Sequence, residues 1–434
     1  MKNDDPRYVN YLAVLREELA PAMGCTEPVA IAFAAAKARE VLGQLPVRVL
    51  VEVSGNIIKN VKSVVVPNTG GLKGLKTAAA AGIIAGKADK KLEAISEVSE
   101  SQKQEIAAFL KSVPIEVKMA DTERVLEIII TVFSQAAGSG AARAEESWAR
   151  VRIIDAHTNI VSIEKDGQIL FKGDEASETV ETDRTMLDVA AILDFAGTVL
   201  LEDVQGLIRR QIEYNSAISA EGLKGNYGAN IGKVLRSGNG DDIKTRAKAA
   251  AAAGSDARMS GCGMPVIILS GSGNQGMTAS LPVIEYAAYL KKSEEELIRA
   301  LVVSDLITIH LKTGIGRLSA YCGVVCAGAA AGAGIAYLQG GRLEEVAHTL
   351  VNALAIVSGI VCDGAKPSCA AKIAAAVDAG ILGYEMYKNG QQFYGGDGII
   401  ARGVENTIRN ISRLGREGMR KTDKEIIRIM LNED

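Results

Sequence analysis

The stretch Cys362-Asp363-Gly364-Ala365-Lys366-Pro367-Ser368-Cys369 places two thiols on either side of a loop, within a region otherwise rich in alanine. Gly364 and Pro367 interrupt any helix between these thiols, so the two sulfurs can turn toward one point. A third thiol can come from Cys322, or from Cys326 one helical turn later, on the preceding uncharged helix. Three thiolates from a helix and a loop predict a metal site with one position left open. The alternative is that all three are ordinary buried thiols.

The composition limits the class of protein. A chain of 434 residues is long enough for two or three domains with large cores. Its 49 Lys and Arg against 52 Asp and Glu give a formal net charge of −3, which argues against nucleic acid as the main partner. The first twenty residues are charged throughout, and the six cysteines do not suggest a disulfide framework. We therefore expect a cytoplasmic protein with reduced thiols.

Two nearly uncharged segments, 318–340 and 259–290, are long enough to cross a membrane. The first is rich in Ala and Gly, and the second contains Pro265 and a polar glycine loop. These features favour a buried central helix and a loop over a membrane span. Helices of this composition can pack closely, and we expect a homodimer without a membrane or nucleic-acid partner.

The residue pattern predicts an α+β fold, with a mainly helical catalytic domain and a smaller mixed α/β domain. Alternating β-branched residues predict strands at 47–53, 57–66, 115–119, 125–133, 148–155 and 159–171. From about residue 184 the pattern becomes helical, with glycine loops between the helices and at most a short strand at 265–269. The predicted divisions are N-terminal helices at 1–45, an α+β domain at 46–180 and a helical domain at 185–434.

Cys25 is a candidate catalytic residue. It follows Gly24 and precedes a predicted helix for which Thr26 is a plausible N-cap. Backbone N–H groups and the helix dipole lower the pKa of a thiol at such a position, which favours a thiolate base or nucleophile. The alternative is a small residue that merely fits a tight turn.

Four loops rich in glycine and amides could hold a carboxylate or phosphate through their backbone N–H groups. They are residues 54–56, 67–71, 225–230 and 270–276. None has the spacing of a nucleotide-binding loop. The three histidines, His157, His310 and His348, do not form a zinc-protease or hydrolase pattern; the first two remain candidates for a site.

Several motifs together resemble the L-cysteine desulfidase family, which is related to the alpha chain of iron–sulfur L-serine dehydratases. They are GCTEP at 24–28, PNTGG at 67–71, GNYG at 225–228, SGCG at 260–263, GNQG at 273–276 and the Cys362…Cys369 pair. The resemblance covers nearly the whole chain. The last two cysteines are spaced as in the desulfidases, and the related dehydratases differ there.

The resemblance implies a [4Fe–4S] cluster held by Cys322, Cys362 and Cys369, without pyridoxal phosphate. Cys326 is then a spare thiol, although it could replace Cys322. An iron without a protein ligand would act on the leaving group of a small amino-acid substrate. The resemblance also implies that Cys25 is the base that removes the α proton.

The implied reaction is α-proton abstraction and β-elimination, which convert L-cysteine to hydrogen sulfide, pyruvate and ammonia. From the chemistry, Asn68, Thr69, Ser272 and Asn274 are expected to hold the substrate carboxylate and amine. One alternative is an L-serine dehydratase that uses the same cluster. A non-enzymatic alternative is a thiol-rich binding or redox-sensing protein.

Overall fold

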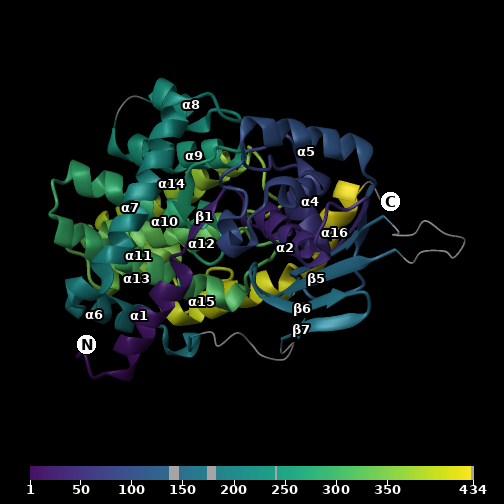
Figure 1. The fold of residues 1–434 in the computed structure, drawn as a ribbon. Coiled ribbons are helices and arrows are strands. Elements are labelled where there is room, and N and C mark those ends of the chain that lie inside the picture. Colours follow the sequence, from purple (N-terminus) through teal and green to yellow (C-terminus); the bar gives the residue numbers. More distant parts are fainter. Residues whose placement is uncertain (136–145, 174–181, 240–241, 432–434) are drawn as a thin grey trace, which may run out of the picture.

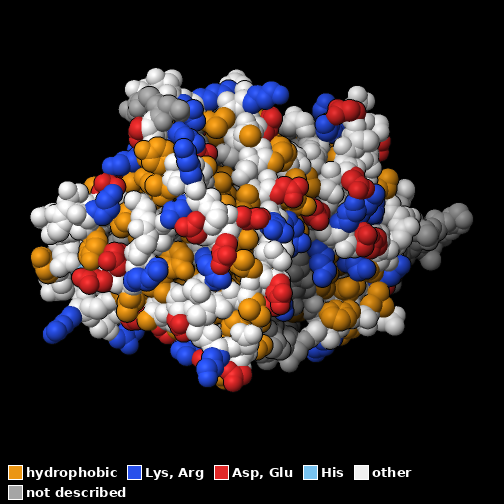
Figure 2. Space-filling model, turned by 90° about the vertical axis from the view of Figure 1, so that its left-hand side faces the viewer, with side chains coloured by type: hydrophobic (Ala, Val, Ile, Leu, Met, Phe, Trp, Pro, Cys, Tyr) orange, Lys and Arg blue, Asp and Glu red, His pale blue; other side chains and the backbone are white. Residues whose placement is uncertain are grey.

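The structure, a computed structural model, consists of a mixed β-sheet with covering helices beside a larger group of helices (Figure 1). It describes residues 1–135, 146–173, 182–239 and 242–431. The predicted α+β, mainly helical fold class is confirmed. On the face drawn in Figure 2, basic and acidic side chains are interspersed.

The strands of the described residues form two sheets. They are β1 (Pro21–Met23), β2 (Arg48–Val53), β3 (Ile115–Met119), β4 (Glu127–Phe133), β5 (Trp148–Ile154), β6 (Ile160–Lys165), β7 (Gln168–Lys172) and β8 (Pro265–Ile267). The larger sheet has the order β3-β2-β4-β5-β6-β7, in which only β2 and β3 are parallel. Alternate residues of β2 are buried, as expected for a sheet with one covered face.

The helices of the first half come before and between the strands of the larger sheet. They are α1 (Pro6–Glu18), α2 (Thr26–Leu42), α3 (Gly55–Val61), α4 (Gly74–Ala85), the 3₁₀ turn η1 (Ala88–Glu93) and α5 (Glu100–Ser112). The helix α2 packs against β4 and β5, whereas α1 packs against helices of the second half. The N-terminal helices are therefore divided between the two parts of the molecule.

Helices make up nearly all of the regular structure after the sheet. They are η2 (Arg184–Met186), α6 (Val189–Thr198), α7 (Leu201–Lys224), α8 (Ile231–Asn239), α9 (Ile243–Met259), α10 (Gly273–Tyr289), α11 (Glu294–Ile315), α12 (Gly323–Leu338), α13 (Leu343–Val357), α14 (Cys369–Lys388), α15 (Val404–Arg413), the π-helical η3 (Leu414–Gly418) and α16 (Arg420–Leu431). None of the described helices is both long enough and apolar enough to span a membrane.

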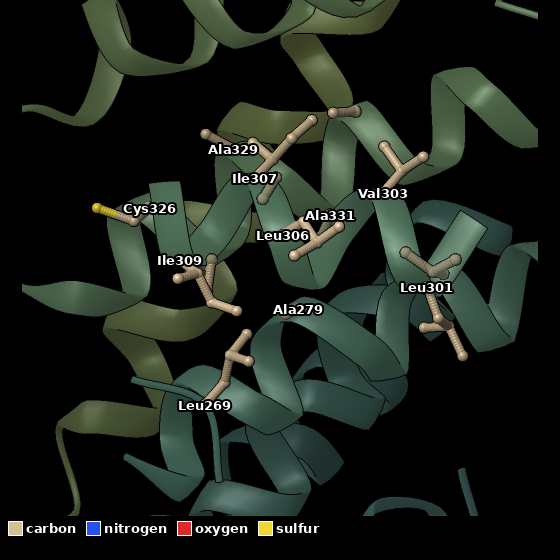
Figure 3. Close-up of a cluster of buried hydrophobic side chains, with 14 of the residues drawn as sticks. Leu269, Ala279, Leu301, Val303, Leu306, Ile307, Ile309, Cys326, Ala329 and Ala331 are labelled. Atoms are coloured by element: carbon tan, nitrogen blue, oxygen red, sulfur yellow. The ribbon is translucent and has the colours of Figure 1, made fainter. Parts of the chain in front are cut away.

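The central helix of this part is α12, which packs against α10, α11, α13 and α14. Its alanines and glycines allow close packing; a Cβ at Gly332 would collide with the backbone of Gly380 in α14. Figure 3 shows part of the core, where Leu306 of α11 and Ala331 of α12 lie beside Ala279 of α10. The small residues noted in the sequence thus form a buried helical centre.

The predicted strand at 57–66 is wrong, because the chain forms α3 there. Strand β2 ends at Val53, and Ser54 then forms the N-cap of the helix. Within α3, Ile57, Ile58 and Val61 are all buried. Their spacing of one and three residues fits one face of a helix as well as an irregular strand, so the pattern alone was ambiguous.

Two contacts connect the sheet part of the molecule with the helical part. The strand β1, just before Cys25, pairs antiparallel with β8 from the second half of the chain. The last helix, α16, returns to the sheet side of the molecule and packs on α3 (Figure 1). The N-terminal turn, α3 and the loops of the helical part therefore meet.

Candidate active site

A cavity of about 100 Å³ brings together four thiols from distant parts of the sequence. Cys25, Cys322, Cys362 and Cys369 all line it. The wall also contains residues of α3 and of the loop before α10. The cavity therefore lies between the N-terminal turn and the cysteine-rich loop.

Four helices begin at this cavity. Cys25 is the N-cap of α2, Ser272 of α10 and Cys322 of α12, while Cys369 is the first residue of α14. The free backbone N–H groups and the positive dipole ends of these helices favour negative charge. The cavity is therefore suited to thiolates and to a carboxylate, and of the four helix starts only that at Cys25 is marked in this role by the sequence.

A short backbone pairing holds Cys322 and Cys362 on the same face. Tyr321 and Val361 form an isolated antiparallel β-bridge. The Cys322 N–H donates to the Ile360 carbonyl at 3.1 Å, and the Cys362 N–H donates to the Ala320 carbonyl at 2.6 Å.

This proximity changes the acidity of both thiols. A hydrogen bond from the Cys322 thiol, helped by Lys59, lowers the pKa of Cys362 to about 6. The same hydrogen bond, together with burial, raises the pKa of Cys322 well above its usual value. Cys362 is therefore the thiol of this pair that ionises first.

Cys369 completes the group of three thiols. Its thiol donates to the Gly364 carbonyl at 3.6 Å, across the loop that the two cysteines bracket. Burial raises its pKa. Cys326 does not line the cavity: it is fully buried in α12, at the edge of the apolar cluster in Figure 3. The structure thus distinguishes Cys322 from Cys326, which the sequence had left as alternatives.

The three thiols supply the kind of ligand that iron–sulfur clusters use. Among the described residues, no three His, Cys, Asp or Glu side chains converge on a point that could hold one ion. In a four-iron cluster each cysteine binds a different iron, so convergence on one point is not required. Lys59, Lys312 and Arg258 also line the cavity and are buried, and their charges favour an anionic group bound by thiolates.

Cys25 is hydrogen-bonded to a carboxylate. Its Sγ donates to Glu27 Oε2 at 3.0 Å. Burial and the charge of Glu27 raise the pKa of Cys25 well above its usual value, which is the reverse of what the helix start alone suggested. The expectation of a lowered pKa was wrong because complete burial and a neighbouring carboxylate outweigh the helix dipole.

Glu27 is the centre of a buried polar network that the sequence analysis did not identify. Its carboxylate accepts from Asn60 Nδ2 at 2.9 Å and from Thr26 Oγ1 at 3.1 Å, and His157 Nε2 lies 3.9 Å from Oε1. Burial opposes its ionisation, but the nearby His157 and a hydrogen bond from Cys25 hold its pKa below the usual range. The only sequence signal for Glu27 was its place in the GCTEP motif.

Several polar atoms on the wall are buried without a partner in the described residues. They are Asn60 Oδ1, His157 Nε2, Arg258 Nε, Gln275 Oε1 and Tyr321 Oη. Leaving one such group unsatisfied costs about 1–3 kcal/mol. A polar molecule that supplies both donors and acceptors would satisfy them, so the cavity is chemically suited to a small polar substrate.

Two of the four expected substrate-binding residues line the cavity. Ser272 and Asn274 belong to the start of α10, and the Asn274 amide oxygen accepts from Arg258 Nη1 at 3.2 Å. Arg258, which is fully buried, is a further residue that the sequence analysis missed. It lies in the last turn of the alanine-rich α9, and no motif marks it.

Asn68 and Thr69 lie outside the cavity and hold the loop around them. Asn68 Nδ2 donates to the Ile95 carbonyl at 3.0 Å, and Thr69 Oγ1 donates to the Val66 carbonyl at 2.7 Å. The preceding Pro67 packs against Gly24, whose φ of +59° suits glycine. The PNTGG loop therefore supports the turn that carries Cys25.

The histidines also separate by position. His157 lines the cavity, although it lies at the junction of β5 and β6 in the sequence. His310 Nε2 instead contacts Glu405 Oε2 at 2.8 Å, and His348 stacks on Tyr387. Only His157 can take part in chemistry at this cavity.

Comparison with known proteins shows similarity over the whole chain. Residues 73–428 match the family model described as serine dehydratase alpha chain. A UPF0597 protein of Desulfitobacterium hafniense is 64% identical over 435 residues, covering 100% of this chain and 99% of the relative. UPF0597 proteins of Lachnoclostridium phytofermentans and Treponema denticola are 50% and 48% identical, covering 98% and 100% of this chain and 100% of each relative.

Proposed function

The chain belongs to the serine dehydratase alpha chain family, and from this premise we propose that it is an iron–sulfur lyase that converts L-cysteine to hydrogen sulfide, pyruvate and ammonia. One observation carries the proposal: the same cavity is lined by the thiols of Cys322, Cys362 and Cys369 and by a fourth thiol, Cys25, which is hydrogen-bonded to a carboxylate. The first three suit a metal cluster, and the fourth suits proton transfer.

Cys322, Cys362 and Cys369 would hold the [4Fe–4S] cluster. When bound, the cluster supplies a Lewis-acidic iron that stabilises the departing sulfide or hydroxide. The chain surrounds this group with buried positive charge from Lys59 and Lys312. These cations would balance the negative charge of the thiolates and so lower the free-energy cost of burying that charge.

The substrate would be held by complementary polar groups. Its carboxylate would lie at the start of α10, near Ser272 and Arg258, where a helix dipole and a guanidinium favour an anion. Its amine would donate to buried acceptors such as Gln275 Oε1, which has no partner among the described residues. This placement uses the unsatisfied atoms of the wall for both ends of an amino acid.

The proton transfers are assigned to Cys25 and its neighbours. Cys25 would release its thiol proton to water and act as a thiolate, whose charge the buried guanidinium of Arg258 and the N–H groups at the start of α2 would favour. Glu27 would hold the sulfur in place through its hydrogen bond with Cys25. The thiolate would take the α proton of L-cysteine, and the electron pair left on the α carbon would expel sulfide from the β carbon. The aminoacrylate formed tautomerises to an imine, and water hydrolyses it to pyruvate and ammonia.

L-serine is the second candidate substrate, because the matched family model is named for a serine dehydratase. The same proton transfers would then expel hydroxide in place of sulfide. Sulfide is the better leaving group, and the spacing of Cys362 and Cys369 matches the desulfidase pattern. These two points favour L-cysteine.

The proposal is tested by anaerobic purification, iron and acid-labile sulfide analysis, and assays with L-cysteine and L-serine. We expect about four irons per chain and sulfide release from L-cysteine that exceeds pyruvate formation from L-serine. Colourless, iron-free anaerobic protein would rule out the cluster. Turnover of L-serine alone would identify the dehydratase. Iron-loaded protein without either activity would favour the redox-sensing alternative.

A further inference from the structure

A second concavity lies on the sheet side of the molecule, outside the catalytic cavity. It is a groove of about 580 Å³ between α16 and the segment 119–125 that joins β3 to β4. Gly55 and Asn56, at the start of α3, also line it. The groove is larger than the catalytic cavity and shares none of its lining residues.

Unpaired charges of opposite sign line the groove from its two segments. Arg420 and Lys424 come from α16, and Asp121 and Glu123 come from the β3–β4 connection. None of these four side chains forms an ion pair with another described residue. A molecule with a negative and a positive end could contact both segments at once.

A buried polar atom gives an independent indication of a ligand. Asn56 is only 8% exposed, and its Oδ1 has no hydrogen-bond partner among the described residues. Because a buried acceptor without a partner is unfavourable, a donor such as an ammonium group would be stabilised beside it. Asn56 therefore adds a positive-end contact to those of Asp121 and Glu123.

The groove is connected to the catalytic cavity through one ion pair. Asp423 of α16 lines the groove and pairs with Lys59, whose ammonium group is almost fully buried. Lys59 in turn lines the catalytic cavity, and its backbone carbonyl lies against Gly364 of the cysteine loop. In α16, no described residue is fully buried, and Ile427 rests on Gly55 of α3, so the helix lies on the surface of the molecule.

We propose that the groove binds a small zwitterion of the amino-acid class, and that Asp423 and Lys59 transmit its presence to the catalytic cavity. The carboxylate would bind Arg420 and Lys424, and the ammonium group would bind Asp121, Glu123 and the Asn56 amide oxygen. Binding would draw α16 toward the β3–β4 connection and so restrict the position of Asp423. This regulatory site is additional to the proposed lyase function, and ligand binding to it can be measured without that activity.

The first experiment measures binding to the full chain without its cluster. Each of the twenty common amino acids is tested by thermal shift, and those that shift the melting temperature are measured by calorimetry. We expect at least one that binds at least roughly tenfold more weakly to the Arg420→Ala/Lys424→Ala variant, because charged hydrogen bonds are lost. Arg416→Ala/Lys421→Ala removes the same charge from neighbouring positions outside the groove and should bind normally.

Two outcomes would overturn the ligand assignment. If no amino acid binds in a way that depends on Arg420 and Lys424, the groove is not an amino-acid site. Inorganic phosphate is the second probe: phosphate binding that needs these cations, with amino-acid binding unaffected by Asp121→Asn/Glu123→Gln, would show an anion site instead. Both outcomes are measured as ligand binding, so an absence of lyase activity would not change either of them.

The second experiment tests the connection by hydrogen exchange. In the unaltered protein, the amino acid identified above should slow amide exchange in α16 and also in residues 360–369, which lie outside the groove and include Gly364 beside Lys59. The Asp423→Asn variant should keep the slowing in α16 and lose it in residues 360–369. Equal slowing of residues 360–369 in both proteins would disprove transmission through Asp423.

Discussion

Tyr321 and Val361 form an isolated antiparallel bridge, which places Cys322 opposite Ile360 and Cys362 opposite Ala320, so that both thiols lie on the same face of the bridge and line one cavity. Two backbone hydrogen bonds flank the bridge and fix its register. A slip by one residue would turn a thiol away from its neighbour, since successive side chains of an extended segment point to opposite sides. The candidate metal centre therefore depends on local backbone pairing as well as on the cysteines.

Replacing the cavity thiols should remove the metal. We expect Cys322→Ser, Cys362→Ser and Cys369→Ser each to lose most of the iron found after anaerobic purification, because serine is a poor ligand for an iron–sulfur cluster. Cys326→Ser is the matched control: its thiol is buried in α12 away from the cavity, so iron should remain. Iron loss on Cys326→Ser with retention on Cys322→Ser would reverse the assignment.

Cys25 and Glu27 should be needed for turnover but not for iron binding. Cys25→Ser is expected to lower kcat about 10²–10⁴-fold, the usual contribution of a positioned base. Glu27→Gln removes the charge that raises the pKa of Cys25, so alkylation of Cys25 in cluster-free protein should begin at lower pH. Glu40→Gln, on the exposed face of the same helix, should change neither property. An unchanged alkylation profile in Glu27→Gln would contradict the electrostatic coupling.

Gly24→Ala should cost more stability than Gly43→Ala. Both glycines have positive φ, at +59° and +85°, so both substitutions strain the backbone by about 1–2 kcal/mol. A Cβ at Gly24 would also overlap the Pro67 ring, whereas nothing lies within 4 Å of a Cβ at Gly43. Overpacking adds roughly 1–3 kcal/mol at Gly24. Urea unfolding measures the difference; equal losses would show that the Pro67 contact is unimportant.

Asp305→Asn should stabilise the protein at neutral and higher pH. Burial raises the pKa of Asp305 from 3.8 to about 7, with Gln211 as its hydrogen-bond donor. The folded state therefore holds this proton more tightly than the unfolded state, and stability falls as pH rises from about 4 to about 7. The full penalty above that range is roughly 4 kcal/mol at 1.36 kcal/mol per pKa unit. Unfolding at about pH 4 and pH 8 should show the gain only at the higher pH; a gain of equal size at both would exclude titration as its cause.

Replacing Asn274 should change KM, whereas replacing Asn68 should change the melting temperature. Asn274→Ala removes a side chain that lines the cavity and contacts Arg258, so KM should rise. Asn68→Ala removes hydrogen bonds to Ile95 and Ser96 behind the cavity, so the melting temperature should fall while KM stays near its original value. A KM increase confined to Asn68→Ala would restore that residue as a substrate contact.

The sequence predicted the fold class because strand and helix periods dominate different parts of the chain. The predicted strand at 57–66 was wrong, because Ile57, Ile58 and Val61 fit a strand and a helix almost equally well. In the structure β2 ends at Val53, and the helix α3 begins directly after it. For the candidate site, spacing and motifs identified the thiols that share the cavity. They could not reveal Arg258, which lies outside the quoted motifs, and they left His157 and His310 as equal candidates, of which only His157 reaches the cavity.

The sequence by itself determined which chemical groups are available: the thiols of the cysteine loop, the GCTEP turn and helices whose side chains are small enough for close packing. Tertiary structure alone decided which thiols face one another and in which direction their acidity shifts. Cys25 shows the reason most clearly, because its local helix start favours a thiolate while burial and Glu27 favour the thiol. Desolvation and charge interactions depend on distances in three dimensions, and residue order does not fix those distances.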